Sequence, residues 1–290
     1  MNLGLGTVQF GQPYGVSNTR GMPAPAEVRE ILAAARGDGC TVLDTAVAYG
    51  EAERVLGEVG VREWQVVSKL SLGDLRPGED LARGLDRVLA DSLARLRLPA
   101  LYGLLVHRPA DLAGAQADAL VAWLHDARRR GYARKVGVSV YRAEQLEDLR
   151  GFVPELVQLP CSVFDQRASR GGHLAALRAR GTEIHLRSIF LQGLLLMAPE
   201  DVPSTLPQAV EPVRRLRDWC GREGLTPLQA ALAYAKGLGD AAVAVVGVTS
   251  LEEWRELGQA FHAADPARHD FSPLAVDDER LLNPGQWAPH

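Results

Sequence analysis

The sequence predicts a single (β/α)8 barrel, and three observations lead to this fold class. Eight apolar segments of strand length alternate with segments of helical periodicity along all 290 residues. The apolar segments are rich in Val, Leu and Ile and mostly lack strict alternation, which is typical of strands buried on both faces of a parallel sheet. No linker or shift in composition divides the chain. We therefore expect one barrel domain over residues 1–290 rather than an open doubly wound sheet.

The predicted strands read, in chain order, LGLGTVQF, TVLDTA, WQVVSKL, LYGLLVH, KVGVSV, LVQLPCS, TEIHLRSI and AVAVVGV. Between them, a stripe of Leu and Val at helical spacing predicts a helix over residues 81–96. A second predicted helix runs from about residue 113 to 130, where Gly131 suits a left-handed helix end. A third begins with Thr226 as N-cap and Pro227 at the first helical position. Additional helices are expected toward the C-terminus.

One connection stands out by its length. The segment from Phe190 to Pro207 is Leu-rich, then rich in Pro and acidic residues, and is too long for a routine βα loop. We expect an extended loop after the seventh strand and regard it as a candidate substrate lid.

Composition argues against several classes of partner. The formal net charge of −4 gives no electrostatic reason to expect nucleic acid or an acidic membrane surface. The apolar stretches are too short to span a membrane, and MNLGLGTVQF lacks the regions of a signal peptide. Cys40, Cys161 and Cys220 form no CxxC pair, which predicts reduced thiols rather than a zinc site. We expect a soluble cytoplasmic protein without a bound metal.

Four ionisable residues lie at the ends of three successive predicted strands. Asp44 and Tyr49 fall in VLDTAVAYG, Lys69 in VVSKL and His107 in LLVH. If these strands are parallel neighbours, the side chains converge on the mouth of the barrel, where catalytic residues of this fold lie. The combination suits proton transfer to an oxygen. A lysine lowers the pKa of a nearby phenol, an aspartate holds the lysine, and a histidine fixes the substrate.

Three of these residues have a simpler interpretation when taken alone. Asp44 suits a turn or helix N-cap, Tyr49 a half-buried aromatic, and His107 a satisfied core histidine. Lys69 is different, because a lysine that ends an apolar run is costly to bury without a carboxylate partner, and Asp44 is the natural partner. Their joint occurrence favours a site. Polar residues also fall at or near four other predicted strand ends, namely Ser139, Gln158, Arg187 and Thr249.

Other catalytic motifs are missing or incomplete. GLGTVQFG has Gly4 and Gly6 of a dinucleotide fingerprint but Gln9 in place of the third glycine, so we reject a Rossmann interpretation. The glycines instead let the backbone pass close to a ligand. The sequence contains no P-loop, HExxH or GxSxG, and its other histidines do not cluster at metal-ligand spacings. A metal-dependent barrel hydrolase is therefore disfavoured.

In its motifs the chain resembles the aldo-keto reductase family. The motifs occur in family order over nearly the whole chain, as LGLGTVQFG, LDTAVAYGEAERVLG, VVSKL, LLVHRP, KVGVSVY, LVQLPCSVFD, RSIFLQGLL and VVGVTSLEE. LGTVQFGQPYGVSN and RSIFLQGLLL look most like a bacterial branch often found with polysaccharide or secondary-metabolite pathways. The resemblance implies a carbonyl reductase, or alcohol dehydrogenase, that uses NADPH or NADH.

The resemblance also implies roles for individual residues. The catalytic tetrad would be Asp44, Tyr49, Lys69 and His107, with Tyr49 as the general acid. Ser139 and Gln158 would hold the nicotinamide carboxamide, and two later segments would contact ribose and phosphates. The expected cofactor-binding residues are Gly6, Thr7, Ser139, Gln158, Arg187, Ser188, Leu191, Gln192, Gly193, Gly247, Thr249, Ser250 and Glu253.

Three features depart from the family pattern. So few residues precede the first strand that the hairpin usually closing the barrel bottom is expected to be short or missing. Arg187 replaces an aromatic that stacks on the nicotinamide in many relatives. We expect it to stack there or to reach a substrate oxygen, the alternative being an ion pair with a distant acid. Glu253 stands where NADPH-specific relatives commonly have a residue that favours the 2′-phosphate. Because its carboxylate would repel a phosphate, it predicts relaxed cofactor specificity or an NADH preference.

The leading hypothesis is therefore an NAD(P)H-dependent oxidoreductase acting on a small carbonyl substrate. The alternative is a catalytically weak regulatory or interaction subunit that binds the cofactor on the same barrel. The sequence names neither the substrate nor the oligomeric state, because specificity in this fold lies in the βα loops.

Overall fold

The eight strands form one closed parallel barrel, in the order β1 to β8 with β8 pairing back to β1. This arrangement comes from a computed structural model, which describes residues 1–147, 149–239 and 241–287. The predicted barrel and all eight predicted strands are confirmed. The strands are β1 Asn2–Gly6, β2 Val42–Asp44, β3 Gln65–Leu70, β4 Leu101–Val106, β5 Ala133–Ser139, β6 Leu156–Pro160, β7 Glu183–Arg187 and β8 Val243–Gly247.

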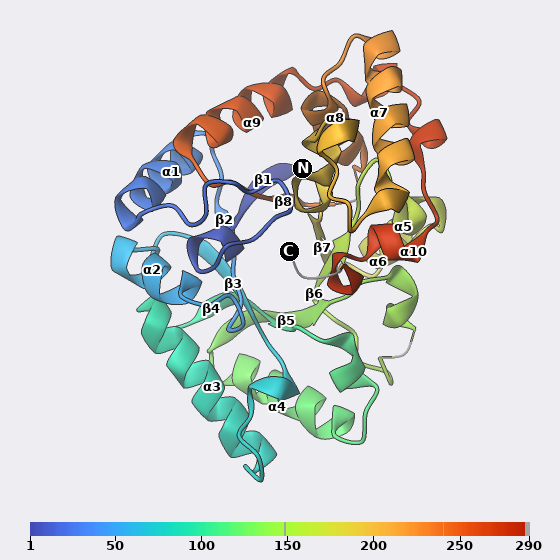
Figure 1. Cartoon of the computed structure of the whole chain (residues 1–290). Helices are drawn as coiled ribbons and strands as arrows, with labels where there is room; N and C mark the ends of the chain where they lie inside the picture. The colour runs from blue at the N-terminus through green and yellow to red at the C-terminus, as the bar shows by residue number, and fades with distance from the viewer. Residues whose placement is uncertain (148, 240, 288–290) are drawn as a thin grey trace.

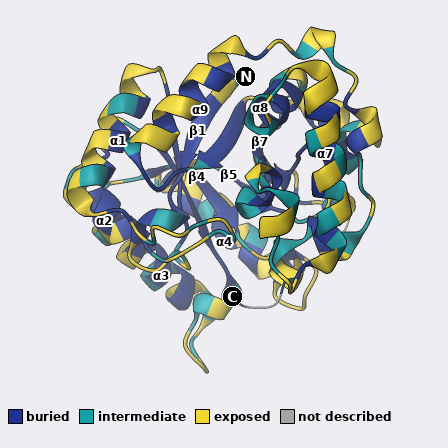
Figure 2. Cartoon of the chain, turned by 45° about the horizontal axis from the view of Figure 1, so that its top comes forward, coloured by how far each residue is buried: buried dark blue, intermediate teal, exposed yellow. Residues whose placement is uncertain are grey.

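Helices surround the barrel on its outside (Figure 1). Figure 2 shows buried strands at the centre and helices whose exposed residues face outward, as expected for amphipathic helices packed on a barrel. The helices are α1 Pro25–Gly37, α2 Ala52–Val59, α3 Leu81–Leu96, α4 Ala117–Arg129, α5 Arg167–Arg170, α6 His173–Ala179, α7 Val210–Glu223, α8 Pro227–Gly237, α9 Leu251–Ala263 and α10 Glu279–Leu282.

The ends of the helices follow local chemistry. Thr226 caps α8 in a reciprocal pair with Gln229, as the Thr-Pro sequence predicts, and such a cap stabilises a helix by about 1 kcal/mol. The helix predicted over 113–130 is shorter at its start. Pro109–Leu112 forms a separate 3-10 turn, and α4 begins only at Ala117. Gly131 follows α4 with φ +81°, in the left-handed region as predicted.

Two layers of apolar side chains hold the barrel. The interior is filled by Val42, Val67, Leu105, Leu156, Val243 and Val245, whereas a larger core lies between the strands and the helices. Each fully buried Val or Leu contributes roughly 1.5–3 kcal/mol through removal from water. Gly137 is required by close packing, because a Cβ there would lie 1.7 Å from the backbone oxygen of Leu156. This packing fixes the strand ends that carry the polar residues.

The extended segment predicted after β7 is present, and part of it is folded. It folds into three 3-10 turns, η5 Leu191–Leu196, η6 Pro199–Asp201 and η7 Pro207–Ala209. The side chains of Leu191, Leu194 and Leu195 are buried, because the Leu-rich part packs into the outer core. Leu191 and Gln192 have positive φ, so this turn is sharply bent. The extended loop is therefore largely a packed element of the barrel wall.

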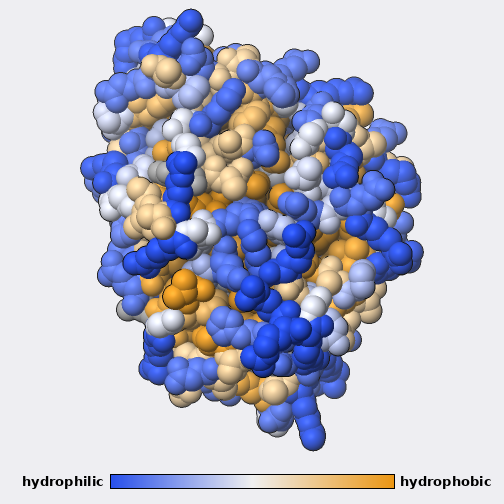
Figure 3. Space-filling view, turned by 180° about the vertical axis from the view of Figure 1, so that it is seen from behind, coloured by the Kyte–Doolittle hydropathy of each residue, from blue (hydrophilic) through white to orange (hydrophobic). Residues whose placement is uncertain are grey.

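Four further observations concern the strands, the cysteines, the helices and the surface. Within the described residues all strands belong to the barrel, so no extra hairpin closes its bottom. Cys40, Cys161 and Cys220 are free and buried. No helix in the described ranges is long and apolar enough to cross a membrane. Seen from behind, hydrophilic side chains cover much of the surface, with hydrophobic ones showing between them in separate places (Figure 3).

Candidate active site

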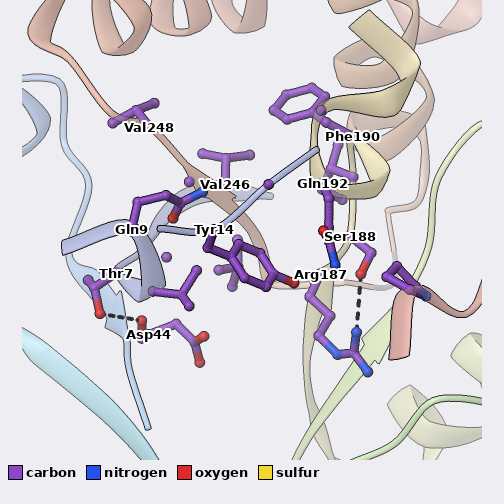
Figure 4. Close-up of a pocket in the computed structure, with 18 of the residues that line it drawn as sticks. Thr7, Gln9, Tyr14, Asp44, Arg187, Ser188, Phe190, Gln192, Val246 and Val248 are labelled. Atoms are coloured by element: carbon purple, nitrogen blue, oxygen red, sulfur yellow. Dashed lines mark hydrogen bonds between the residues drawn. The ribbon is translucent and has the colours of Figure 1, made fainter. Parts of the chain in front are cut away.

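A cavity of about 470 Å³ opens at the C-terminal ends of the strands. Most of the residues singled out from the sequence line it (Figure 4). Three do not. Lys69 lies buried beneath the lining, Leu191 is buried in the outer core, and Ser250 caps α9 by accepting a hydrogen bond from the Glu253 N–H. The predicted residues that line the cavity are Gly6, Thr7, Asp44, Tyr49, His107, Ser139, Gln158, Arg187, Ser188, Gln192, Gly193, Gly247, Thr249 and Glu253.

Lys69 is the centre of the predicted tetrad. Its Nζ donates to Asp44 Oδ2 at 2.8 Å and to the Thr45 backbone oxygen at 3.0 Å, and lies 3.4 Å from the Tyr49 hydroxyl. The side chains of Lys69 and Asp44 are 1% and 6% exposed. Removing one partner of a buried ion pair leaves an uncompensated charge and typically costs 3–5 kcal/mol. The Lys69 ammonium is therefore held in a fixed position beside the phenol.

The charge state of Lys69 follows from two opposing effects. Burial alone would lower the pKa of its ammonium, but the neighbouring Asp44 carboxylate and Tyr49 phenol raise that pKa above its ordinary value. Lys69 thus stays protonated near pH 7, since its unperturbed pKa is already about 10.4.

His107 follows β4 and faces Tyr49 across the site. The two rings meet edge to face, with centroids 5.8 Å apart. Burial, together with the positive charges of Lys69 and Arg187, lowers the pKa of His107 to about 3. The imidazole is therefore neutral near pH 7 and has one N–H to donate and one nitrogen to accept.

Asp44 has a second partner that the sequence reasoning did not anticipate. Gln158 Nε2 donates to Asp44 Oδ1 at 2.7 Å, so both carboxylate oxygens are occupied. Ser139 pairs with Gln158 in the β5–β6 register, and its Oγ lies 3.4 Å from Gln158 Oε1. Gln158 thus connects Ser139, the other residue expected to hold the carboxamide, with the buried ion pair.

Arg187 ends β7 at the edge of the cavity. Its guanidinium donates to the Val140 backbone oxygen at 3.0 Å and to Ser188 Oγ at 3.1 Å, and lies 4.7 Å from the centroid of the Tyr141 ring. Among the described residues no carboxylate pairs with it. The ion pair with a distant acid, considered as the alternative for this residue, is therefore not found.

Glu253 occupies the start of α9. Its carboxylate accepts from the Thr249 backbone N–H at 2.6 Å and from Thr249 Oγ1 at 3.0 Å. Glu253 lines the cavity, so its negative charge is at the site and is not simply directed away into solvent. It therefore occupies both the backbone N–H and the hydroxyl donor of Thr249.

Several lining residues were missed by the sequence reasoning. Tyr14 and Tyr141 lie in loops, where no periodicity marks them. Ser17 was missed as well, and its Oγ lies so near Gly193 that a Cβ there would be 1.7 Å away. The loop after β1 and the turn after β7 therefore meet at the cavity. Gln9 was noted only as a missing glycine, yet it lies beside Val246 in Figure 4.

The residues present fit an elongated, polar cofactor. Gln9 Oε1 is buried with no hydrogen-bond partner, and a donor group on a bound ligand would satisfy it. Gly247 provides close backbone approach, because a Cβ there would lie 2.5 Å from Gln9 Nε2. Polar groups at Ser139, Ser188 and Thr249 are spread along the same cavity. No group of His, Cys, Asp and Glu side chains in the described residues is arranged to hold a metal ion.

The chain matches known proteins in sequence. The sequence model of the aldo/keto reductase family matches residues 2–269. The 6-dehydroglucose reductase of Novosphingobium aromaticivorans is 33% identical over 145 residues, covering 45% of this chain and 47% of that protein. An aldo-keto reductase of Mycobacterium tuberculosis is 34% identical over 128 residues, covering 42% of this chain and 43% of that protein. The alignments thus span about half the length of these curated relatives.

Solved structures agree in fold. The holo form of an aldo-keto reductase from Bacillus halodurans superposes with a TM-score of 0.75, covering 97% of this chain and 95% of that one at 18% identity. Its apo form gives a TM-score of 0.72. At this level of identity the likeness extends to the barrel and its helices, while the side chains of the cavity must be interpreted from this chain itself.

Proposed function

The chain belongs to the aldo/keto reductase family, as its motifs predicted, and from that premise we propose that it interconverts a carbonyl and an alcohol with NADPH or NADH. One observation carries the proposal. Lys69, fixed by Asp44 at 2.8 Å, lies beside the hydroxyl of Tyr49, and Tyr49 and His107 line one cavity. When bound, the nicotinamide supplies or accepts the hydride.

Tyr49 acts in this proposal as the general acid in the direction of reduction. Its hydroxyl gives a proton to the oxygen on which negative charge develops, and Lys69 stabilises the phenolate that remains. The ammonium is well suited to this because Asp44 and the Thr45 backbone oxygen hold it in one place. Positioned acid–base catalysis of this kind is typically worth 10²- to 10⁴-fold in rate.

His107 orients the carbonyl. Because its lowered pKa keeps the ring neutral, it donates a hydrogen bond without placing a second positive charge near Lys69. A neutral donor polarises the substrate oxygen and leaves Tyr49 as the proton source. Holding the reacting groups in register is itself a major contribution to catalysis.

The cofactor is held, in this proposal, by residues of this chain along the cavity. Ser139 and Gln158 bind the carboxamide, and Ser188, Gln192, Gly193, Gly247, Thr249 and Glu253 bind ribose and phosphates. Glu253 favours NADH, because its carboxylate repels a 2′-phosphate and accepts from a free 2′-hydroxyl.

The test is oxidation of NADPH and NADH with a panel of aldehydes, followed at 340 nm for the wild type and Tyr49→Phe. We expect the variant to bind both nucleotides as the wild type does and to lose at least about 10²-fold in turnover. Equal rates for the two proteins would remove Tyr49 from the mechanism. Tight nucleotide binding with no turnover on aldehydes, sugars or keto acids would instead favour the regulatory subunit.

A further inference from the structure

We propose that Arg187 recognises a carboxylate group on the carbonyl substrate. This inference rests on the proposed function and narrows it to substrates that carry both a carbonyl and a carboxylate. Arg187 is the last residue of β7, and it lines the same cavity as Tyr49 and His107. A group held there lies within reach of the proposed acid and of the residue that orients the carbonyl.

The first argument is an uncompensated charge. Arg187 is half-buried, and no carboxylate in the described part of the chain pairs with it. The other charged side chains that line the cavity are already bound. Asp44 holds Lys69, and Glu253 is bound to Thr249. A guanidinium partly removed from water and lacking a counter-ion attracts an anion more strongly than one at an open surface.

The second argument is the way the guanidinium is held. It donates to the Val140 backbone oxygen and Ser188 Oγ, and it lies over the Tyr141 ring. These contacts use two of the five N–H groups of an arginine, so three remain for a ligand. The guanidinium is thus fixed in place with donors to spare. A planar, fixed guanidinium suits the planar carboxylate, to which arginine binds through two parallel hydrogen bonds.

The third argument is the chemistry of its neighbours. The positive charge of Arg187 acts on both His107 and Tyr14. In Figure 4 the hydroxyl of Tyr14 points toward Arg187. A tyrosine hydroxyl has an ordinary pKa of about 10, so this hydroxyl stays protonated near pH 7 and can donate. A cation and a neutral donor side by side complement an anionic oxygen.

Two other anions could in principle use the same donors. A substrate phosphate carries close to two negative charges, whereas this part of the cavity offers one uncompensated cation, which matches the single charge of a carboxylate. A phosphate of the cofactor is the second source, and it predicts that Arg187 controls nucleotide affinity. Assays with a phosphorylated aldehyde and measurements of nucleotide affinity distinguish these two anions from a substrate carboxylate.

The test compares 4-carboxybenzaldehyde with 4-nitrobenzaldehyde, which has a similar shape but no net charge. Wild type, Arg187→Met and Arg142→Met are assayed with saturating NADPH or NADH. Arg142 is a matched control, because it is exposed beside Tyr141 and does not line the cavity. We expect Arg187→Met to lose about 10- to 100-fold in kcat/KM for the carboxylate, mainly through KM, since hydrogen bonds to charged groups have this strength. The kcat/KM of Arg187→Met for the nitro compound should change little, and Arg142→Met should resemble the wild type with both aldehydes.

Three results would overturn the inference. The first is an equal loss for both aldehydes, which would mean that Arg187 only supports the Val140 and Tyr141 loop. The second is a higher dissociation constant for NADPH or NADH with no change in aldehyde preference. The third concerns phosphorylated substrates. In that result Arg187→Met changes the ratio of kcat/KM for glyceraldehyde 3-phosphate to that for glyceraldehyde more than it changes the ratio for the two benzaldehydes.

A binding measurement separates this inference from the proposed function. If no aldehyde is turned over, the proposed function fails, but calorimetric titration of the protein with oxidised nucleotide and 4-carboxybenzaldehyde still tests Arg187. Tighter binding to the wild type than to Arg187→Met supports the inference, and equal binding overturns it. Arg187→Gln, which keeps a polar side chain without the charge, repeats both arms if Arg187→Met does not fold.

Discussion

The two ends of the barrel carry the same four types of ionisable side chain in different arrangements. At the mouth, Lys69 is central, and the Tyr49 hydroxyl and His107 face a cavity. At the opposite end a carboxylate is central. Glu183 accepts from Tyr102 at 2.7 Å, contacts His185 Nε2 at 2.7 Å, and is hydrogen-bonded by Lys135.

The difference determines what each cluster can do. At the bottom, burial and the bond to Glu183 raise the pKa of Tyr102. Burial acts to raise the pKa of Glu183, but its bonds from His185, Lys135 and Tyr102 outweigh burial and lower it to about 2. None of these four residues lines the cavity. The bottom cluster pairs its charges internally and faces no cavity, although His185 Nδ1 is buried without a hydrogen-bond partner, whereas the mouth presents a phenol and an imidazole to a ligand. Residue types alone therefore do not define a site.

The largest effect on turnover is expected when Lys69 at the mouth is replaced, compared with Lys135 at the bottom. Lys69→Met should reduce turnover by about 10²- to 10⁴-fold, because the proton donor loses its charged partner and Asp44 remains buried alone. Nucleotide affinity should stay nearly unchanged. Lys135→Met is the matched control, and its turnover should equal that of the wild type. Steady-state rates and nucleotide titrations check both variants. Retention of more than about a tenth of the rate by Lys69→Met would show that Lys69 does not support the acid.

A smaller effect is expected on stability against acid. Because His107 has a pKa near 3 when folded and about 6.5 when unfolded, the unfolded chain binds more protons between these values. Folding stability is therefore lost as pH falls from about 6.5 to 3, by at most about 1.4 kcal/mol per pH unit from this group. In His107→Gln the slope of unfolding free energy against pH should be shallower over this window. Identical slopes from urea titrations would contradict the burial-driven shift.

The bottom cluster predicts its own acid sensitivity at lower pH. Glu183 has a lowered pKa when folded, so its contribution to stability is present above the unfolded value and is lost as pH falls toward about 2. Glu183→Gln should cost about 1–3 kcal/mol near pH 7, since hydrogen bonds to a charged group are lost, and should leave KM for the aldehyde unaltered. A change in KM without loss of stability would mean that the two ends of the barrel are coupled.

The smallest effect concerns cofactor choice. Replacing Glu253 by Gln removes the negative charge beside the proposed 2′-phosphate position, and we expect the affinity for NADPH relative to NADH to rise by up to about tenfold, or ~1.4 kcal/mol. Glu252→Gln is the control, because Glu252 is exposed and does not line the cavity. Fluorescence titration gives the dissociation constants of NADPH and NADH for the wild type and both variants, and these constants test the prediction. Wild-type binding of NADPH more than about tenfold tighter than of NADH would show that Glu253 does not set the preference.

The strands and the residues at their ends were predictable, because buried parallel strands have a strong apolar pattern and end at one common mouth. Asp44, Lys69 and His107 were found in this way. Tyr14 and Tyr141 were not, because they lie in loops, where neither periodicity nor spacing marks a residue. The bottom cluster was also missed, since Lys135 and Glu183 stand at strand starts, where charged residues are ordinary. Leu191 was predicted to bind the cofactor, but its side chain is buried in the outer core and does not line the cavity.

The most direct test of the account compares the two tyrosines in one assay. NAD(P)H oxidation with a reactive aldehyde is measured for Tyr49→Phe and Tyr102→Phe, each of which removes a single hydroxyl from a Tyr-Lys-carboxylate-His cluster. The account predicts a loss of at least about 10²-fold in turnover for Tyr49→Phe and wild-type turnover for Tyr102→Phe. Equal rates for the two variants would contradict the claim that the mouth, and not the bottom, holds the acid.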